Sequence, residues 1–593
     1  MGAEEVGRAA ALVACGLALA LGGCGGGDDG VAGAERSDRA DGKPAITEQK
    51  ALAVSESLLG DGGSTASAGD EESYEPAGEI VADSGFRPWV DGFSFENYGN
   101  DVEPQNLTEV QIQALFGDDV CVGGDGETCK LTPAAERWME TQNARMDGGH
   151  CMGFSVAAIR MFVGALEEKD FGADTTAELE IQGNTDLQAS IAEHWVYQDL
   201  PGINEQTFQG TPAETLDRLA ENLNSGKENF TIGIFKPDGT AGHAITPFAV
   251  EDKGDDEYAV LVYDNNFPGI VRALDVDVAE DTWRYVGGTN PKDLDQVYEG
   301  DAETQSMILL PTSPGENLQP CPFCQGEDGE AGEGFGASLG KDQQYSQVTL
   351  NGDVENHPHL ILMDEQERVT GIVDGELVNE IPGVEVEQSM SVRNWEAAPE
   401  PAYLVPAGKD IVITVDGTNL TRKTKASLEL VAGGLVIAVD EIKIKPGQQD
   451  QVALSGSGNG LYYATDGTNE ETPEFYAGVD DDDASYTFAA TAVGVKRGST
   501  IGLVVDQESG TVLLDADGAK ASVGGKAYFA LLVGKETPNA TRIWGTDSLR
   551  LSGRRKEGAY FNYRETPKAG RPLKLEVGPE DGPFRTVKAP YQP

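Results

Sequence analysis

The heptapeptide Gly-His-Cys-Met-Gly-Phe-Ser at residues 149–155 places a cysteine, Cys151, at the start of an apolar stretch with helical periodicity. We expect a helix that begins at Cys151 or one residue beyond it and turns its apolar face inward. Further along the chain stand Gly-His-Ala at 242–244 and Tyr-Asp-Asn-Asn at 263–266, each at one end of a predicted strand. A cysteine, a histidine and then an acidic or amide residue supply every part of a cysteine-nucleophile site. The pattern therefore predicts an enzyme.

A hairpin is expected to bring the second and third members of this site together. Predicted strands 244–250 and 258–263 flank a Gly/Asp turn, so the end of the second strand returns beside His243. Either Asp264 or Asn265 then holds the imidazole in the tautomer that faces the cysteine. The spacing leaves both residues open. We favour Asp264 because it directly follows the strand.

The thiolate form of Cys151 is what the chemistry requires, and two neighbours favour it. They are the imidazolium of His243 and the N-terminus of the predicted helix. His150 is interpreted as a local hydrogen-bonding residue, because adjacent residues on a helix do not face each other. His194, within Ala-Glu-His-Trp-Val-Tyr, is expected to pack on a helix.

Helical patterns precede strands between residues 86 and 312. Thr132 and Pro133 predict the N-cap and first turn of a helix that continues to about Arg145. Further predicted elements are helices 186–198 and 212–223 and strand 230–235. Helices followed by a strand meander are typical of an α+β domain.

The order Cys, His, Asp/Asn resembles that of the papain-like superfamily of cysteine peptidases, in particular its bacterial members. The residues that carry the likeness are Cys-Met-Gly-Phe-Ser at 151–155 and Gly-His-Ala at 242–244, within about residues 130–270. The resemblance implies a papain-like α+β domain over 86–312. It also implies a catalytic triad of Cys151 as nucleophile, His243 as general base and acid, and Asp264 or Asn265 as the orienting residue.

The resemblance further implies an oxyanion hole built from the Cys151 N–H and an upstream glutamine side chain. The nearest upstream glutamine is Gln142, which is further from the cysteine than the usual spacing, while Arg145 and His150 are closer. The sequence departs from the family pattern here, and the loss of one oxyanion donor costs on the order of 10²–10³ in rate.

Beyond residue 312 the pattern changes. Residues 313–344 are rich in Gly, Pro and Glu and are interpreted as a linker, and 345–593 alternate at period two between Gly, Asp and Pro turns. The strand candidates are 348–350, 359–363, 369–373, 411–415, 426–431, 436–444, 461–464, 485–493, 500–505, 511–514 and 527–533. We expect an all-β region of one or two β-sandwich, immunoglobulin-like modules.

The first 24 residues read as a lipoprotein signal peptide. A short apolar run ends at Leu-Gly-Gly-Cys, which resembles a bacterial lipobox and implies lipid attachment to Cys24. Residues 25–85 are acidic and Gly-rich and are interpreted as a disordered tether. The expected location is the bacterial cell envelope, with the lipid as the only link to the membrane.

The formal net charge is −58, from 101 acidic and 43 basic residues. Such a field repels phosphate backbones, so no nucleic-acid partner is expected. A bound calcium at the acidic run 480–483 is less favoured than a solvated loop, because no EF-hand spacing accompanies it. No cofactor and no metal site is predicted.

The number and spacing of the cysteines indicate which one is the nucleophile. Outside the signal region, Cys121 and Cys129 form one close pair and Cys321 and Cys324 another, which leaves Cys151 as the odd cysteine. In an oxidising compartment the close pairs are expected to be disulfides. Alternatives for the second pair are a redox motif or a zinc site shared with the histidines at 357 and 359.

Three functions are compatible with these residues. The first is an envelope thiol hydrolase that cleaves a peptide or amide substrate. The second is a non-catalytic binding or adhesion lipoprotein on the same scaffold, and the third is acyl transfer to an amine by the same triad.

Overall fold

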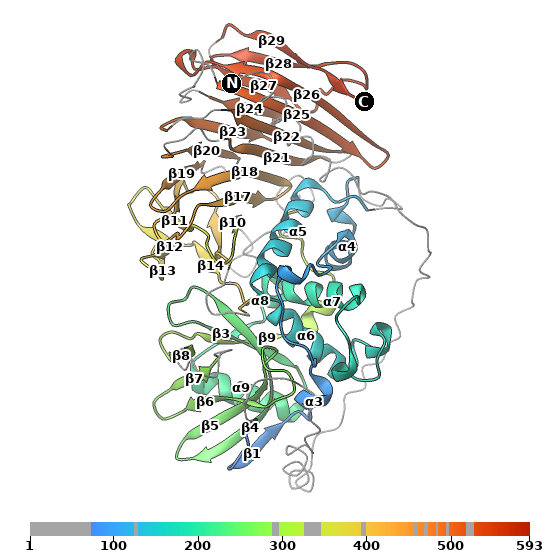
Figure 1. Ribbon diagram of the computed structural model, residues 1–593, viewed down its shortest axis with the longest axis vertical. Coiled ribbons are helices and arrows are strands. Elements are labelled where there is room, and N and C mark those ends of the chain that lie inside the picture. Colours follow the sequence, from blue (N-terminus) through green and yellow to red (C-terminus); the bar gives the residue numbers. More distant parts are fainter. Residues whose placement is uncertain are drawn as a thin grey trace.

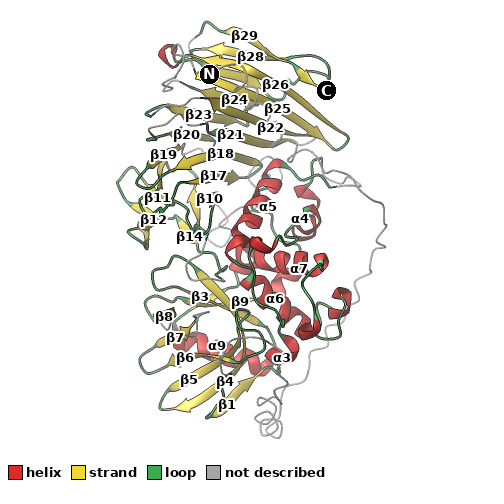
Figure 2. Cartoon of the chain, viewed as in Figure 1, coloured by secondary structure: helices red, strands yellow, loops and turns green. Residues whose placement is uncertain are grey.

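The computed structural model describes residues 73–593, apart from 124–128, 288–295, 325–344, 393–398, 456–458, 468–471, 482–483, 494–496, 517–526 and 581. Strands make up 42% of the structure and helices 20%. The strands form three large antiparallel sheets of nine, ten and eleven strands. Figures 1 and 2 show the nine-stranded sheet at one end of the molecule, the other two at the opposite end, and the helices along one side between them.

The nine-stranded sheet has the order β2-β9-β3-β4-β5-β6-β7-β8, and β1 pairs with β4. Its central strands are covered on both faces, since ten consecutive residues of β4 are buried. The strands are β1 (Glu79–Asp83), β2 (Phe208–Gln209), β3 (Phe230–Phe235), β4 (Gly242–Gly254), β5 (Glu257–Tyr263), β6 (Arg272–Asp277), β7 (Thr282–Val286), β8 (Val297–Asp301) and β9 (Met307–Pro311).

The helices follow the predicted start signals. The Thr132 side chain caps α5 by accepting a hydrogen bond from Ala135 N, with Pro133 in the first turn. The α-helices are α3 (Pro88–Asp91), α4 (Glu109–Phe116), α5 (Pro133–Arg145), α6 (Cys151–Phe162), α7 (Thr185–Trp195), α8 (Pro201–Asn204) and α9 (Pro212–Ser225). α6 therefore begins at the cysteine, as expected.

The predicted papain-like α+β fold is wrong. The C-terminal region is all-β, but the N-terminal region is not a clear papain-like α+β domain. The sequence motifs fix only the order of a cysteine, a histidine and an acidic residue along the chain. The layers of the fold depend on strands that lie outside these motifs. β1 and β6–β9 widen the sheet well beyond the three strands that the sequence predicted. The helices also share a buried core with the C-terminal sheets, so they do not belong to the first sheet alone.

The two C-terminal sheets lie face to face around one apolar core to which both contribute. The ten-stranded sheet has the order β14-β15-β10-β17-β18-β21-β22-β25-β26-β30, and the other has the order β13-β12-β11-β16-β19-β20-β23-β24-β27-β28-β29. From β17 onward successive hairpins alternate between the sheets. The all-β prediction is confirmed, as a single long two-layer stack.

The strands of the ten-stranded sheet are β10 (Tyr345–Gly352), β14 (Glu385–Glu387), β15 (Ala402–Pro406), β17 (Thr424–Ala432), β18 (Leu435–Ile444), β21 (Glu474–Asp481), β22 (Ala484–Val493), β25 (Ala527–Thr537), β26 (Ala540–Leu551) and β30 (Tyr591–Gln592). Those of the eleven-stranded sheet are β11 (His359–Met363), β12 (Val369–Val373), β13 (Glu376–Asn379), β16 (Ile411–Asp416), β19 (Gln449–Leu454), β20 (Gly460–Ala464), β23 (Thr500–Asp506), β24 (Thr511–Asp515), β27 (Gly558–Asn562), β28 (Leu573–Gly578) and β29 (Arg585–Ala589).

α5 joins the helices to the ten-stranded sheet. Arg137 on this helix pairs with Glu429 at 3.3 Å and with Asp440 at 2.5 Å, and Thr141 Oγ1 donates to Glu429 at 2.7 Å. Phe323 of the predicted linker is fully buried and packs against Trp138, with ring centroids 5.2 Å apart. The start of that segment is therefore part of the core.

Some sequence predictions lie outside the described residues. These are the signal peptide, the lipid site at Cys24, residues 25–72 of the tether, residues 325–344 of the linker and two residues of the acidic run. The prediction of a disordered tether is wrong for residues 79–83, which form β1 and pair with β4. Among the described residues, no helix is long and apolar enough to cross a membrane.

Candidate active site

Cys151 is the first residue of α6 and is fully buried. The residue before it is held on three sides: His150 N donates to Asn97 Oδ1 at 2.7 Å, and its ring nitrogens contact Tyr98 O at 2.7 Å and Asn106 Oδ1 at 2.9 Å. His150 is thus a local hydrogen-bonding residue, as predicted. The first N–H groups of a helix have no partner within it and carry partial positive charge, so this position favours an anion.

α6 is seated closely between its neighbours. Gly153 faces α7, where a Cβ atom would lie 2.0 Å from the carbonyl oxygen of Ile191. On the sheet side, Ser155 Oγ lies 3.0 Å from Thr231 Oγ1 and 2.7 Å from Thr246 Oγ1. These buried contacts hold the helix start in place relative to β3 and β4.

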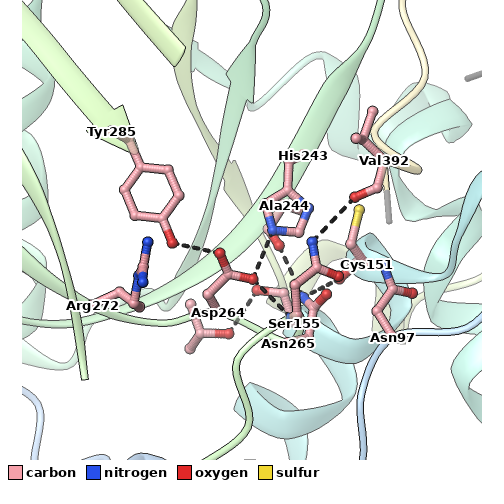
Figure 3. Close-up of polar contacts among 12 residues, drawn as sticks. Asn97, Cys151, Ser155, His243, Ala244, Asp264, Asn265, Arg272, Tyr285 and Val392 are labelled. Atoms are coloured by element: carbon pink, nitrogen blue, oxygen red, sulfur yellow. Dashed lines mark hydrogen bonds and ion pairs between the residues drawn. The ribbon is translucent and has the colours of Figure 1, made fainter. Parts of the chain in front are cut away.

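His243 and Asp264 form a fully buried pair at the ends of neighbouring strands. His243 is the second residue of β4, Asp264 follows β5, and Nε2 of the ring lies 2.8 Å from Asp264 Oδ1. The carboxylate also accepts from Asn266 N at 2.9 Å and from the hydroxyl of Tyr285. Figure 3 shows the carboxylate between the imidazole and the Tyr285 ring.

The charges of this pair reinforce each other. Burial alone would lower the pKa of His243, but the charge of Asp264, then that of Cys151, and the hydrogen bond to Asp264 raise it to about 10. Burial likewise works against the Asp264 carboxylate, yet the His243 charge lowers the pKa of Asp264 below its ordinary value. These neighbours thus favour the imidazolium form of the ring, which is the state that stabilises a thiolate beside it.

Asn265, the second candidate for the orienting residue, has a different position. Its Nδ2 donates to the carbonyl oxygens of Cys151 at 3.2 Å and Ala244 at 3.0 Å. It connects the start of α6 to β4 and does not bond the imidazole. Of the two residues that the sequence left open, Asp264 is the one in contact with His243.

The thiol of Cys151 makes its hydrogen bond to another part of the chain. Sγ donates to the carbonyl oxygen of Met390 at 3.1 Å, and Nδ1 of His243 is a buried nitrogen with no nitrogen or oxygen partner among the described residues. Figure 3 shows the sulfur beside the imidazole. Tyr298 stacks on the imidazole of His243 with a centroid separation of 6.4 Å.

A segment from the C-terminal region covers the site. We call residues 388–392, Gln-Ser-Met-Ser-Val, the covering segment. It runs parallel to the start of β4: Gly242 N donates to Ser389 O at 3.0 Å, and Val392 N donates to Gly242 O at 3.2 Å. Gly242 directly precedes His243, so an extended peptide lies bound at the histidine.

Met390 anchors the covering segment through both its main chain and its side chain. Its N–H donates to Gln198 Oε1 at 2.7 Å. Its side chain is buried in an apolar cluster, and its sulfur would lie 2.5 Å from a Cβ atom at Gly233. The absence of a side chain at Gly233 therefore makes room for Met390.

Gln142 lies on α5 and is fully buried, but no hydrogen bond among the described residues joins it to Cys151. Its Oε1 accepts from Arg145 at 3.1 Å, and Arg145 pairs with Asp199 at 3.1 Å. Its Nε2 is a buried donor without a partner among the described residues. Gln142 thus belongs to a polar network that ends next to Gln198, the residue that binds Met390.

The remaining predicted residues are distributed as follows. Cys121–Cys129 and Cys321–Cys324 are at disulfide distance, and Cys151 is the free cysteine of the described residues. The disulfide at 321–324 makes the alternative zinc site on those cysteines wrong.

His194 packs on α7 with Nδ1 2.7 Å from Ser190 O, and burial lowers its pKa to about 4. Asp481 pairs with Arg564 at 2.9 Å.

The sequence did not predict several residues of the site that lie far from Cys151 along the chain. Tyr285 and Tyr298 lie on β7 and β8, which were not predicted, and Gln198 and Met390 carry no motif. A weak signal existed for the tyrosines, because β7 and β8 alternate buried and more exposed residues. No local signal marks the covering segment.

The chain matches none of the protein-family models searched, and no curated protein or solved structure shows significant similarity to it.

Proposed function

We propose that this protein is a thiol-dependent hydrolase that cleaves peptide or amide bonds. Cys151 is the nucleophile, His243 the general acid and base, and Asp264 the residue that orients the ring. The observation that carries the proposal is the buried His243–Asp264 pair, 2.8 Å apart, with the His243 pKa raised to about 10 beside the free thiol.

The reaction starts from a thiolate and an imidazolium. The sulfur attacks the carbonyl carbon, the C–N bond breaks, and the imidazolium gives its proton to the leaving amine. Neutral His243 then takes a proton from water as the water attacks the thioester, which releases the acid and restores the thiolate. The N–H groups in the first turn of α6 stabilise the oxyanion of each tetrahedral intermediate.

The bound covering segment supports a peptide as the substrate class. Main-chain bonds from Gly242 hold an extended strand with a carbonyl oxygen 3.1 Å from Cys151 Sγ, and Met390 places an unbranched apolar side chain in a closed pocket. An incoming peptide that replaces this segment uses the same donors and acceptors. The enzyme is then latent while residues 388–392 are in place.

The test uses a variant in which the covering segment is weakened. Met390→Ala is incubated with a library of internally quenched extended peptides, with Cys151→Ala/Met390→Ala as the matched control. We expect turnover that requires the thiol and selects an unbranched apolar residue. Equal signals from the two variants for every peptide would exclude hydrolysis.

The second candidate function is a non-catalytic peptide-binding lipoprotein. The observation that favours it is the complete burial of Cys151, whose thiol is occupied by Met390 O. This candidate predicts that Met390→Ala binds the same peptides without cleaving them. Product analysis with an added amine separates hydrolysis from acyl transfer, since an amide product forms only in the latter.

The proposed setting is the bacterial cell envelope, with the chain anchored by lipid at Cys24. Two features of the chain support export: close cysteine pairs at disulfide distance and the lipobox-like Leu-Gly-Gly-Cys.

A further inference from the structure

Two imidazoles and one carboxylate, none of them part of the candidate active site, converge at the junction of the two C-terminal sheets. His357 precedes β11, His359 is its first residue, and Glu400 precedes β15 in the other sheet. One ligand atom from each of the three lies within 4.8 Å of the others. The sequence brings the two histidines near each other, but only the fold adds the carboxylate.

The distances suit a small metal ion. Glu400 Oε2 lies 2.9 Å from His359 Nδ1 and 3.5 Å from His357 Nε2. In a tetrahedral zinc site, bonds of about 2.0–2.2 Å place neighbouring donor atoms about 3.3–3.5 Å apart. An ion can therefore enter between these atoms with small side-chain shifts.

Glu400 is positioned as a ligand would be. Its side chain is fully buried, and its other oxygen, Oε1, accepts from Leu360 N at 2.8 Å and from Tyr403 Oη at 3.0 Å. Hydrogen bonds of this kind orient ligating carboxylates in metal sites. They leave Oε2 directed at the two rings.

The two rings remain accessible to solvent. The His357 side chain is 13% exposed and that of His359 is 22% exposed, while Glu400 below them is covered. This arrangement provides the entry path and the open coordination position that a three-ligand site needs.

We propose that His357, His359 and Glu400 bind a divalent transition-metal ion of the zinc class. The ion connects the start of β11 to Glu400, two residues before β15, and so joins the two sheets. This inference does not depend on the proposed hydrolase activity.

The test is calorimetric titration of the full-length, metal-stripped chain with ZnCl₂, in excess Mg²⁺ to occupy exposed carboxylates. We expect one tight equivalent in the wild type. Glu400→Gln and His359→Gln should each weaken it by more than the roughly 10–100-fold that loss of an outer hydrogen-bond partner costs. Tyr403→Phe removes such a partner and should fall within that range.

Two matched controls keep the test specific. Glu365→Gln makes the same change at an exposed carboxylate in the loop after β11, and Cys151→Ala removes the free thiol; both should bind zinc like the wild type. Circular dichroism checks that each variant is folded. Tight binding that survives both Glu400→Gln and His359→Gln, that disappears in Cys151→Ala, or that Mg²⁺ abolishes in the wild type would overturn the proposal.

Discussion

His243 experiences two opposing influences, and the balance between them decides what the candidate site can do. Burial disfavours the charged ring, yet the interactions with Asp264 first and Cys151 second outweigh burial and raise the pKa of His243 to about 10. A ring that stays protonated at neutral pH acts first as a partner for a thiolate and then as a proton donor. The role of the residue thus follows from its neighbours.

Replacing His243 should therefore slow the reaction of Cys151 with an alkylating reagent. In the Met390→Ala background, where access is equal, we expect His243→Ala to reduce the alkylation rate at neutral pH by roughly tenfold or more. Asp264→Ala should have a smaller effect, because it orients the ring without supplying the positive charge. The measurement is the rate as a function of pH.

Asn265→Ala is the control for that series, because it leaves the His243–Asp264 pair intact. Its rate should fall less than that of Asp264→Ala, because Asn265 does not bond the imidazole and only connects the start of α6 to β4. A loss at Asn265 together with a silent Asp264→Ala would assign the orienting role to Asn265.

The pKa of Glu400 is lowered in the folded chain, whereas that of His243 is raised. Burial raises its pKa, but the hydrogen bonds and charges of His357 and His359 outweigh burial and lower the pKa to about 2. Its unfolded pKa is about 4.3. A lowered native pKa contributes stability above the unfolded value, and this contribution is lost as the pH falls from about 4.3 to about 2.

We expect Glu400→Gln, measured with a chelator present, to have a lower free energy of unfolding than the wild type by roughly 3 kcal/mol at neutral pH. The difference should shrink steadily below about pH 4.3 in denaturant titrations. A difference that is constant with pH would contradict the ionic role of Glu400 beside the two histidines and Tyr403.

At the scale of elements, α6 depends on close contact with its neighbours. Its start is connected to β4 through Asn265, and its face toward α7 has no room for a side chain at Gly153. The position of the thiol relative to His243 therefore depends on helix packing as much as on the two side chains.

Gly153→Ala should accordingly destabilise the chain and displace α6 from α7. Overpacking of this kind costs about 1–3 kcal/mol, which thermal unfolding can measure. Gly352→Ala is the matched control, because its Cβ atom would meet nothing closer than 3.4 Å. Equal melting temperatures for both variants would show that the α6–α7 contact is not tight.

The covering segment is an element without regular secondary structure of its own, and Met390 holds it in place. Truncation of this side chain leaves a void beside Gly233 and weakens the segment by about 2–5 kcal/mol. We expect Met390→Ala to raise the alkylation rate of Cys151 in the native chain. Met363→Ala, at a methionine that is 39% exposed on β11, should leave that rate unchanged. If both variants react alike, the segment does not control access.

At the scale of the whole molecule, one sheet carries His243 and leads to Asp264, while two others form a long stack with a common core. Successive hairpins belong alternately to the two stacked sheets, so the two layers grow in parallel along the chain. The segment that leaves this stack covers the candidate site, and the helices contact both parts. The region that carries the candidate site and the all-β region are therefore structurally dependent on each other.

Anchoring concerns the whole chain, and its test is direct. We expect the wild type to partition into detergent, because lipid attached at Cys24 provides the several acyl chains that stable anchoring requires. Cys24→Ser should release the protein into the aqueous phase. Recovery of wholly soluble wild type with an N-terminus elsewhere would contradict the lipobox interpretation.

Local patterns in the sequence were enough to locate many of the elements. Period-two alternation predicted β11 and β12 at their observed bounds, and the Thr132–Pro133 signal placed the start of α5. The close spacing of the cysteine pairs also predicted their pairing. Each of these features depends on interactions between residues near each other in the chain, which is why a single sequence contains them.

Only the tertiary structure decided how the elements combine. The Cys151–Met390 hydrogen bond spans 239 residues, and the His359–Glu400 contact joins two sheets. The papain-like prediction failed for the same reason, since the order of three residues carries no information on which strands pair around them. Strand pairing and the course of the covering segment depend on which distant apolar faces are buried together, and local periodicity does not specify that choice.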